Sequence, residues 1–118
     1  MEHATKEVTR DQILASDVRG TAVYNGEGEK IGHIDDIVLN KRDGRATVAI
    51  MSFGGFLGLG EQYHPLPWEN LSYDVGVGGY VVNVSREQLE GAPRFARGEE
   101  PDWNDPAYGQ RLSGYYGL

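Results

Sequence analysis

Glycine constrains the fold of this chain more than any other residue. The sequence contains 17 glycines among 118 residues, and they separate short runs rich in valine, isoleucine, threonine and tyrosine. β-Branched and aromatic residues favour strands, whereas glycine adopts the positive φ angles that tight turns require. This pattern predicts a mostly β protein in which many short strands are joined by tight turns.

Strand-forming runs and turn residues alternate through residues 21–84. The turn at residues 25–28 contains Asn and Gly and joins the first two runs as a hairpin, and Asp43-Gly44 marks the next tight turn. Gly-rich residues 75–78 separate the last two runs. The expected strands cover residues 21–24, 30–39, 45–53, 62–68, 71–74 and 79–84.

The run at residues 30–39 does not alternate cleanly between apolar and polar positions. Its apolar residues change parity across Asp35 and Asp36, and a β-bulge at this point would place them all on suitable faces. A helix with a stripe of isoleucines is the alternative interpretation, but Gly32 and the β-branched content favour the strand. We therefore expect a bulged strand.

The composition of two further strands predicts their positions in the sheet. Residues 45–53 are apolar on both parities, as expected for a strand that is covered on both faces. Residues 62–68 include Pro65 and Pro67, which cannot donate to a sheet ladder. We expect this second strand to lie at an edge or to end early.

Helix signals appear only after the last expected strand. Ser85 followed three residues later by Gln88 predicts a capping box at the start of a short helix. Asp105-Pro106 predicts the N-cap and first residue of a terminal helix that carries an aromatic stripe. The predicted fold is mostly β, a small antiparallel barrel of about six strands with short C-terminal helices.

Composition excludes several classes of function. The formal net charge is −7, and no cluster of lysine and arginine stands out in the sequence, so we expect no nucleic-acid partner. The absence of cysteine excludes thiolate catalysis, thiolate metal sites and disulfides within this chain. The N-terminus is polar, and no run approaches the roughly 20 apolar residues that span a bilayer, which predicts a cytoplasmic protein without a membrane span.

Four segments in order carry a family resemblance. They are ASDVRG at residues 15–20, GEKIGHIDDIVL at 28–39, SFGGFLGLG at 52–60 and PLPWE at 65–69. In this order they resemble the PRC-barrel family, whose namesake is the cytoplasmic domain of the photosynthetic reaction centre H subunit. The tail, with PDWNDP at 101–106 and YYG at 115–117, is similar to the tails of short stand-alone bacterial members.

The resemblance implies a small barrel that docks onto other proteins. It implies a polar N-terminal extension at residues 1–14, a PRC-barrel domain at 15–92 and a C-terminal tail with an aromatic helix at 93–118. The resemblance does not extend to the membrane helix of the reaction-centre subunit or to the RNA-associated domain of the family's ribosome-maturation factor, and we expect neither in this protein. A photosynthetic or ribosomal role is therefore not implied directly.

An interaction surface is the strongest candidate site. Large apolar residues on the glycine-rich loop at 54–60 would be unfavourable in water, so we expect them either to cap one end of the barrel or to contact another chain. The aromatic tail has the same two alternatives, packing on its own barrel or clasping a second subunit. The predicted contact residues are Phe56, Leu57, Leu59, Trp103, Tyr108, Leu112, Tyr115 and Tyr116.

Metal and catalytic sites are weaker candidates. His33 and Asp35 would share one face of their strand, and imidazole with carboxylate suits zinc or manganese, but two ligands do not make a site. His64 shares the parity of Leu66, which favours a packing role over a role as a ligand or base. We predict no cofactor and no catalytic residue, with His33, Asp35 and His64 as weak metal candidates only.

These observations favour a non-enzymatic protein-interaction or assembly module that forms a homodimer. Its expected partners are a second copy of the chain and another protein. The alternatives are a barrel that binds a small ligand or a divalent metal, and an accessory factor related to electron-transfer assemblies of the reaction-centre H-subunit type.

Overall fold

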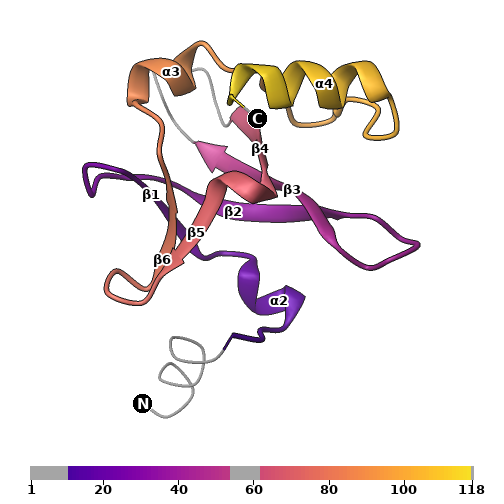
Figure 1. Cartoon of the computed structure of the whole chain (residues 1–118). Coiled ribbons are helices and arrows are strands. Elements are labelled where there is room, and N and C mark those ends of the chain that lie inside the picture. Colours follow the sequence, from indigo (N-terminus) through magenta and orange to yellow (C-terminus); the bar gives the residue numbers. More distant parts are fainter. Residues whose placement is uncertain (1–10, 54–61, 118) are drawn as a thin grey trace.

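A computed structural model describes residues 11–53 and 62–117 of the chain, which form one curved sheet with short helices packed on it (Figure 1). The strands are β1 (Ala22–Asn25), β2 (Lys30–Leu39), β3 (Ala46–Phe53), β4 (Gln62–Pro67), β5 (Leu71–Asp74), β6 (Gly79–Val82) and β7 (Phe95–Ala96). The helices are α2 (Ala15–Val18), the 3-10 turn η2 (Trp68–Asn70), α3 (Arg86–Glu90) and α4 (Pro106–Tyr115). The mostly β prediction is confirmed.

The topology of the sheet differs from the predicted antiparallel barrel. Its seven strands follow the order β5-β6-β1-β2-β3-β4-β7, and within the described residues the two ends of this order do not pair to close a barrel. The β1–β6 pair is parallel, with Val23 opposite Tyr80, whereas all other pairs are antiparallel. The prediction of an antiparallel barrel was therefore wrong at this pair, because β6 returns to β1 from far along the chain instead of through a hairpin.

Strand β2 contains the bulge that its sequence predicts. Its register against β3 shifts between Ile34 and Asp36, so that Ile34 pairs with Met51 and Asp36 pairs with Ile50. The bulge allows Ile34 and Ile37, which differ in parity, to pack against the same core. A second register shift, against β1, skips Ile31, which is also buried.

Strands β3 and β4 form the centre of the packed structure. The residues of β3 from Ala49 to Phe53 are buried without alternation, which confirms that this part of the strand is covered on both faces. β4 ends at Pro67, and β7 pairs with it only at Gln62 and Tyr63. Beyond Tyr63 the outer edge of β4 has no strand neighbour within the described residues, which is where its two prolines lie.

Both predicted C-terminal helices are present. The side chain of Ser85 accepts a hydrogen bond from the backbone N–H of Gln88 at 3.0 Å, and the Gln88 side chain accepts one from the Ser85 N–H at 3.1 Å. Asp105 caps α4 by accepting a hydrogen bond from the Ala107 N–H, and Pro106 is the first helical residue. The single turn α2 and the short strand β7 carry no such signals and were not predicted.

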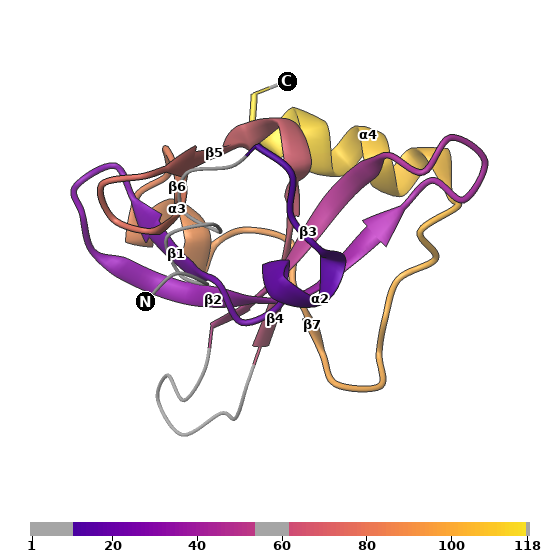
Figure 2. The same cartoon turned by 90° about the horizontal axis from the view of Figure 1, so that it is seen from below.

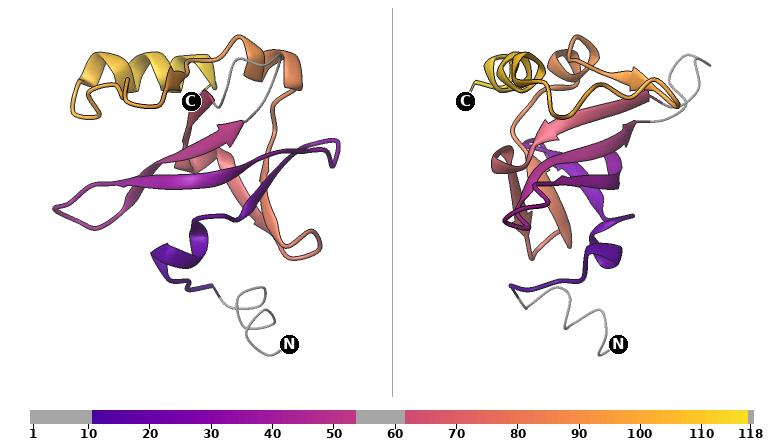
Figure 3. Two further views of the ribbon diagram at one scale, coloured as in Figure 1. Left: turned by 180° about the vertical axis from the view of Figure 1, so that it is seen from behind. Right: turned by 90° about the vertical axis from the view of Figure 1, so that its right-hand side faces the viewer.

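The helices lie on two sides of the sheet. Figures 1 and 3 show α3 and α4 together at one end and α2 at the opposite end. Seen from below in Figure 2, the segment between β7 and α4 loops out beside the sheet before it returns to the helix. α3 and the strands share one apolar core, to which Val23, Ile31, Ile34, Ala49, Met51, Phe53, Leu66, Val82 and Leu89 contribute. None of the helices among the described residues is long and apolar enough to cross a bilayer.

Candidate functional site

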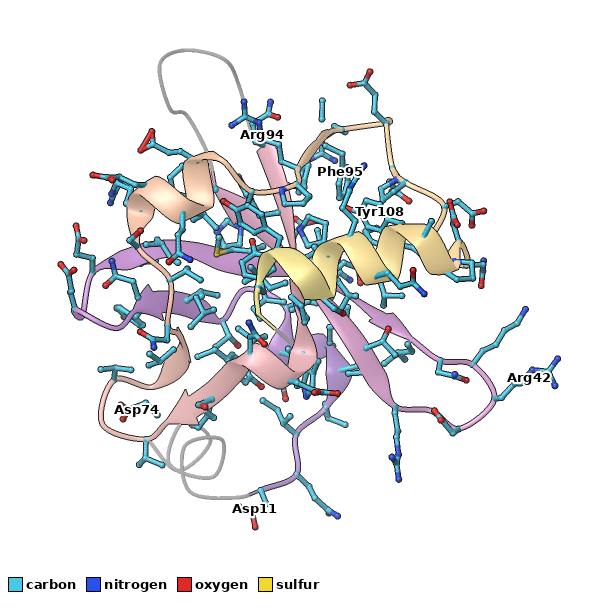
Figure 4. The ribbon with its side chains drawn as sticks, turned by 45° about the horizontal axis from the view of Figure 1, so that its top comes forward. Asp11, Arg42, Asp74, Arg94, Phe95 and Tyr108 are labelled. Carbon is cyan, nitrogen blue, oxygen red and sulfur yellow. The ribbon has the colours of Figure 1, made fainter. Side chains whose placement is uncertain are left out.

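The aromatic tail packs against its own sheet. Phe95 stacks on Tyr63 of β4 with ring centroids 5.5 Å apart, Trp103 meets Phe95 edge to face at 5.8 Å, and Tyr108 meets Trp103 at 5.9 Å. Figure 4 shows Phe95 and Tyr108 close together beside the first turn of α4. This ladder attaches the tail to β4 through intramolecular contacts.

The C-terminal half of the predicted aromatic stripe is also largely occupied. Leu112 is buried, and Tyr116 packs against the apolar core and accepts a hydrogen bond at its backbone carbonyl from the Asn70 side chain. Burial raises the pKa of the Tyr116 hydroxyl, with a further contribution from Tyr115. Tyr115 is the most exposed member, although its hydroxyl donates to the Gln88 carbonyl. The tail therefore offers much less free surface than its sequence suggests.

The loop part of the predicted interaction surface, with Phe56, Leu57 and Leu59, lies outside the described residues.

The structure separates the three weak metal candidates. In an antiparallel pair, residues opposite one another project to the same face of the sheet. His33 pairs with Ser52 and therefore shares a face with it, whereas His64 pairs with Met51 and shares the opposite face. Asp35 lies at the bulge and lines a different hollow from His33. No three potential metal ligands gather among residues 11–53 and 62–117.

His64 is enclosed in the apolar core. Its residue is 1% exposed, its ring meets Phe53 edge to face at 5.5 Å, and neither ring nitrogen has a hydrogen-bond partner among the described residues. Burial, reinforced by the positive charge of Arg94, lowers the pKa of His64 from 6.5 to about 4. The Leu89 backbone acts in the opposite direction and is the smallest of the three contributions. His64 is therefore a neutral packing residue at pH 7, as its parity predicted.

A small hollow beside the bulge holds opposite charges. Asp35, Asp36 and Glu100 line it together with Arg97, and its volume is about 70 Å³. Arg97 lies over the ring of Tyr63 at 5.3 Å and donates a hydrogen bond to its hydroxyl. Asp36 accepts a hydrogen bond from the Ile37 N–H at 2.8 Å. The contact of Arg97 with Tyr63 links the segment that follows β7 to β4.

The β5–β6 hairpin is an exposed apolar surface that sequence analysis did not single out. Val75 is 56% exposed and Val77 is 43% exposed in the turn, and Tyr73 of β5 is also exposed. Among the described residues no strand pairs with the outer edge of β5, where only the Leu71 N–H is engaged, by the Trp68 carbonyl. Val75 and Val77 alternate with the glycines of the turn at residues 75–78, and apolar residues at a turn are the sequence signal that could have revealed this surface.

The fold and these surfaces define a class: a small domain with a mixed β-sheet, a packed aromatic tail and an exposed edge strand. A profile of the PRC-barrel domain matches residues 10–89, which is more than half of the chain. The protein belongs to the PRC-barrel family.

Comparison with solved structures identifies proteins of similar fold. A search of the curated proteins finds no match. Among solved structures, the chain is similar to the crystal structure of a putative 16S ribosomal RNA processing protein, RimM, from Pseudomonas aeruginosa, with 17% sequence identity and a TM-score of 0.42. The match covers 67% of this chain and 48% of that one, so this chain spans about half the length of that relative.

Proposed function

We propose that this PRC-barrel protein is a docking module that binds a second copy of itself through the β5 edge and the β5–β6 turn. The observation that carries the proposal is the combination of an unpaired strand edge with exposed apolar side chains beside it. An unpaired edge presents backbone N–H and C=O groups that readily pair with another strand. Figure 4 shows the end of this hairpin, marked by Asp74, well away from α4 and the aromatic ladder.

The sequence of β5 favours pairing over protection. Edge strands are commonly protected from association by lysine, proline or a bulge. β5 has the sequence LSYD and pairs with β6 without a register shift, so it carries none of these features. Its charged residue, Asp74, accepts a hydrogen bond from the Gly76 N–H and is thereby part of the turn.

A twofold axis between two β5 strands gives a self-complementary contact. Antiparallel pairing of the two edges would extend each sheet into the other, and the same residues would face each other on both sides of the axis. Tyr73, which packs edge to face on Tyr80 with ring centroids 5.3 Å apart, would lie at the centre of this contact. Val75 and Val77 would be covered at its two ends.

The proposed function is binding, without catalysis of a chemical reaction. General acid–base catalysis needs a proton acceptor within reach of a substrate. His64, the histidine considered as a base, is enclosed in the core, and His33 lies on the other face of the sheet. These positions favour a binding function.

Placing charge on the hairpin should abolish self-association. We expect the Val75→Lys/Val77→Lys double variant to have the mass of a single chain in solution under conditions where the wild type has the mass of two, because two copies would bring four lysines together. Light scattering after size-exclusion chromatography measures both masses. Leu39→Lys is the matched control, since Leu39 is 51% exposed and lies near the β2–β3 turn at the opposite end of the molecule (Figure 3). A wild type that stays a single chain, or a two-chain mass that survives in the double variant, would contradict the proposal.

A further inference from the structure

An open groove lies at the end of the sheet where β2 begins and β3 ends. It is bounded by the start of β2, the end of β3 and the first residue of α3, and it has a volume of about 280 Å³. The residues that line it are Lys30, Ile31, Gly32, His33, Ser52, Phe53 and Arg86. Since the β5–β6 hairpin contributes no lining residue, this groove is distinct from the proposed docking surface.

The groove concentrates nitrogen donors in an acidic protein. Lys30, His33 and Arg86 come together there although the chain as a whole carries a formal charge of −7. Arg86 is more than 50 residues from the other two in sequence, so a search for basic runs along the chain could not find this cluster. No hydrogen bond or ion pair engages the Lys30 or His33 side chain within the part of the chain that the structure describes. These two side chains are available to a ligand.

Arg86 is held loosely at the groove. Its Nη2 lies 3.7 Å from Oε2 of Glu29, and its guanidinium carbon lies 5.9 Å from the centroid of the Phe53 ring. Both side chains of the ion pair are about half exposed, at 43% and 50%, and exposed pairs of this kind contribute little free energy. Oε1 of Glu29 accepts a hydrogen bond from the Asn25 side chain at 2.9 Å, so the carboxylate can stay in place when Arg86 moves to another anion.

We propose that this groove binds a small organic phosphate, with Arg86 and Lys30 on the phosphate group and the Phe53 side of the groove against the organic part. The planar guanidinium of arginine donates two parallel hydrogen bonds to phosphate, and lysine adds a compact positive charge. Two fixed positive charges match the charge of a phosphomonoester near pH 7, and the imidazole of His33 supplies a further donor. The volume is close to the lower end of small-molecule sites.

Glu29 provides a substitution that should strengthen phosphate binding. Its carboxylate competes with the phosphate for Arg86 and repels a dianion that enters the groove. Removing its charge in Glu29→Gln should therefore strengthen phosphate binding. A residue with a merely structural role would not have this effect.

Phenyl phosphate is the probe that tests the groove. We expect titration followed by ¹H–¹⁵N NMR to shift the backbone signals of Lys30, His33 and Arg86, and phenylacetate and inorganic phosphate to cause smaller shifts at the same residues. Arg86→Gln should weaken binding by about tenfold or more, because it removes a charge-assisted hydrogen bond. Glu29→Gln should tighten binding, and Arg42→Gln, which removes the same charge at the distant β2–β3 turn (Figure 4), should leave it unchanged.

The opposite results would overturn the proposal. These are an absence of shifts at millimolar phenyl phosphate, equal effects of Arg86→Gln and Arg42→Gln, or weaker binding in Glu29→Gln. The unperturbed part of each NMR spectrum reports whether a variant is folded. Neither result bears on self-association, which the mass of the hairpin variant tests separately.

Discussion

Acidification from pH 7 to below pH 4 should lower the free energy of unfolding by about 3 kcal/mol through His64 alone. The folded protein holds this side chain in its neutral form, with a pKa of about 4 against the ordinary value of 6.5. Burial in the core is the main cause, and the charge of Arg94 acts in the same direction.

The direction of this effect follows from proton binding. Between pH 6.5 and about pH 4 the unfolded chain binds a proton at His64 and the folded chain does not. Acid therefore favours the unfolded state throughout this range. The contribution is fully present above pH 6.5 and is lost progressively as the pH falls towards 4.

His64→Leu separates this effect from the titration of carboxylates. Leucine keeps an apolar side chain of similar volume in the core and removes two ring nitrogens that have no partner among the described residues. We expect urea unfolding to show that the variant is at least as stable as the wild type at pH 7 and gains about 3 kcal/mol relative to it by pH 4. Parallel stability curves for the two proteins across this range would contradict the assignment.

Gly32→Ala should destabilise the protein by about 2–3 kcal/mol, because β2 and β3 approach too closely at this point for a side chain. A Cβ atom on Gly32 would lie 2.3 Å from the backbone oxygen of Ser52 and 3.0 Å from Cγ of Met51. The oxygen belongs to the central β2–β3 ladder and cannot rotate away as a side chain would. The two strands would have to separate next to the His33–Ser52 pair.

Gly109→Ala is the matched control for the same change. Gly109 lies within α4, and a Cβ atom there would meet no other atom within 4 Å. Alanine should therefore stabilise the helix by up to about 1 kcal/mol, because it restricts the unfolded chain. Thermal or urea unfolding measures both variants. Equal effects of the two substitutions would show that the close strand approach at Gly32 is not significant.

Local signals in the sequence predicted most individual elements. The capping box of Ser85 and Gln88, the Asp105 N-cap and the bulge between Ile34 and Asp36 depend on residues close together in the chain, and the structure confirms each of them. Pro65 and Pro67 similarly indicated that this part of β4 has an edge without a strand neighbour, which the structure shows among the described residues. Such features depend on local backbone hydrogen bonding, which sequence patterns describe well.

Long-range features could not be predicted in the same way. The parallel pairing of β1 with β6 depends on where the chain leads after β4, and the groove depends on α3 bringing Arg86 to the start of β2. The sequence predicted the aromatic stripe of α4, but not whether it faces its own sheet or a partner. That depends on two tertiary contacts, of Trp103 with Phe95 and of Phe95 with Tyr63. The exposed hairpin was missed because its valines lie among turn glycines.

Hydrogen–deuterium exchange of the β5 amides at low and high protein concentration tests the docking proposal most directly. If two copies pair through this edge, exchange at Tyr73 should slow as the concentration rises, because its N–H points away from β6 and would gain a partner from the second chain. Successive N–H groups of a strand point to opposite edges, and the outward N–H of Leu71 already donates to the Trp68 carbonyl, so Ser72 and Asp74, which face β6, should change less. Exchange in the exposed β2–β3 turn should stay the same. Exchange at β5 that does not depend on concentration while the protein has a two-chain mass would place the interface elsewhere and contradict the proposal.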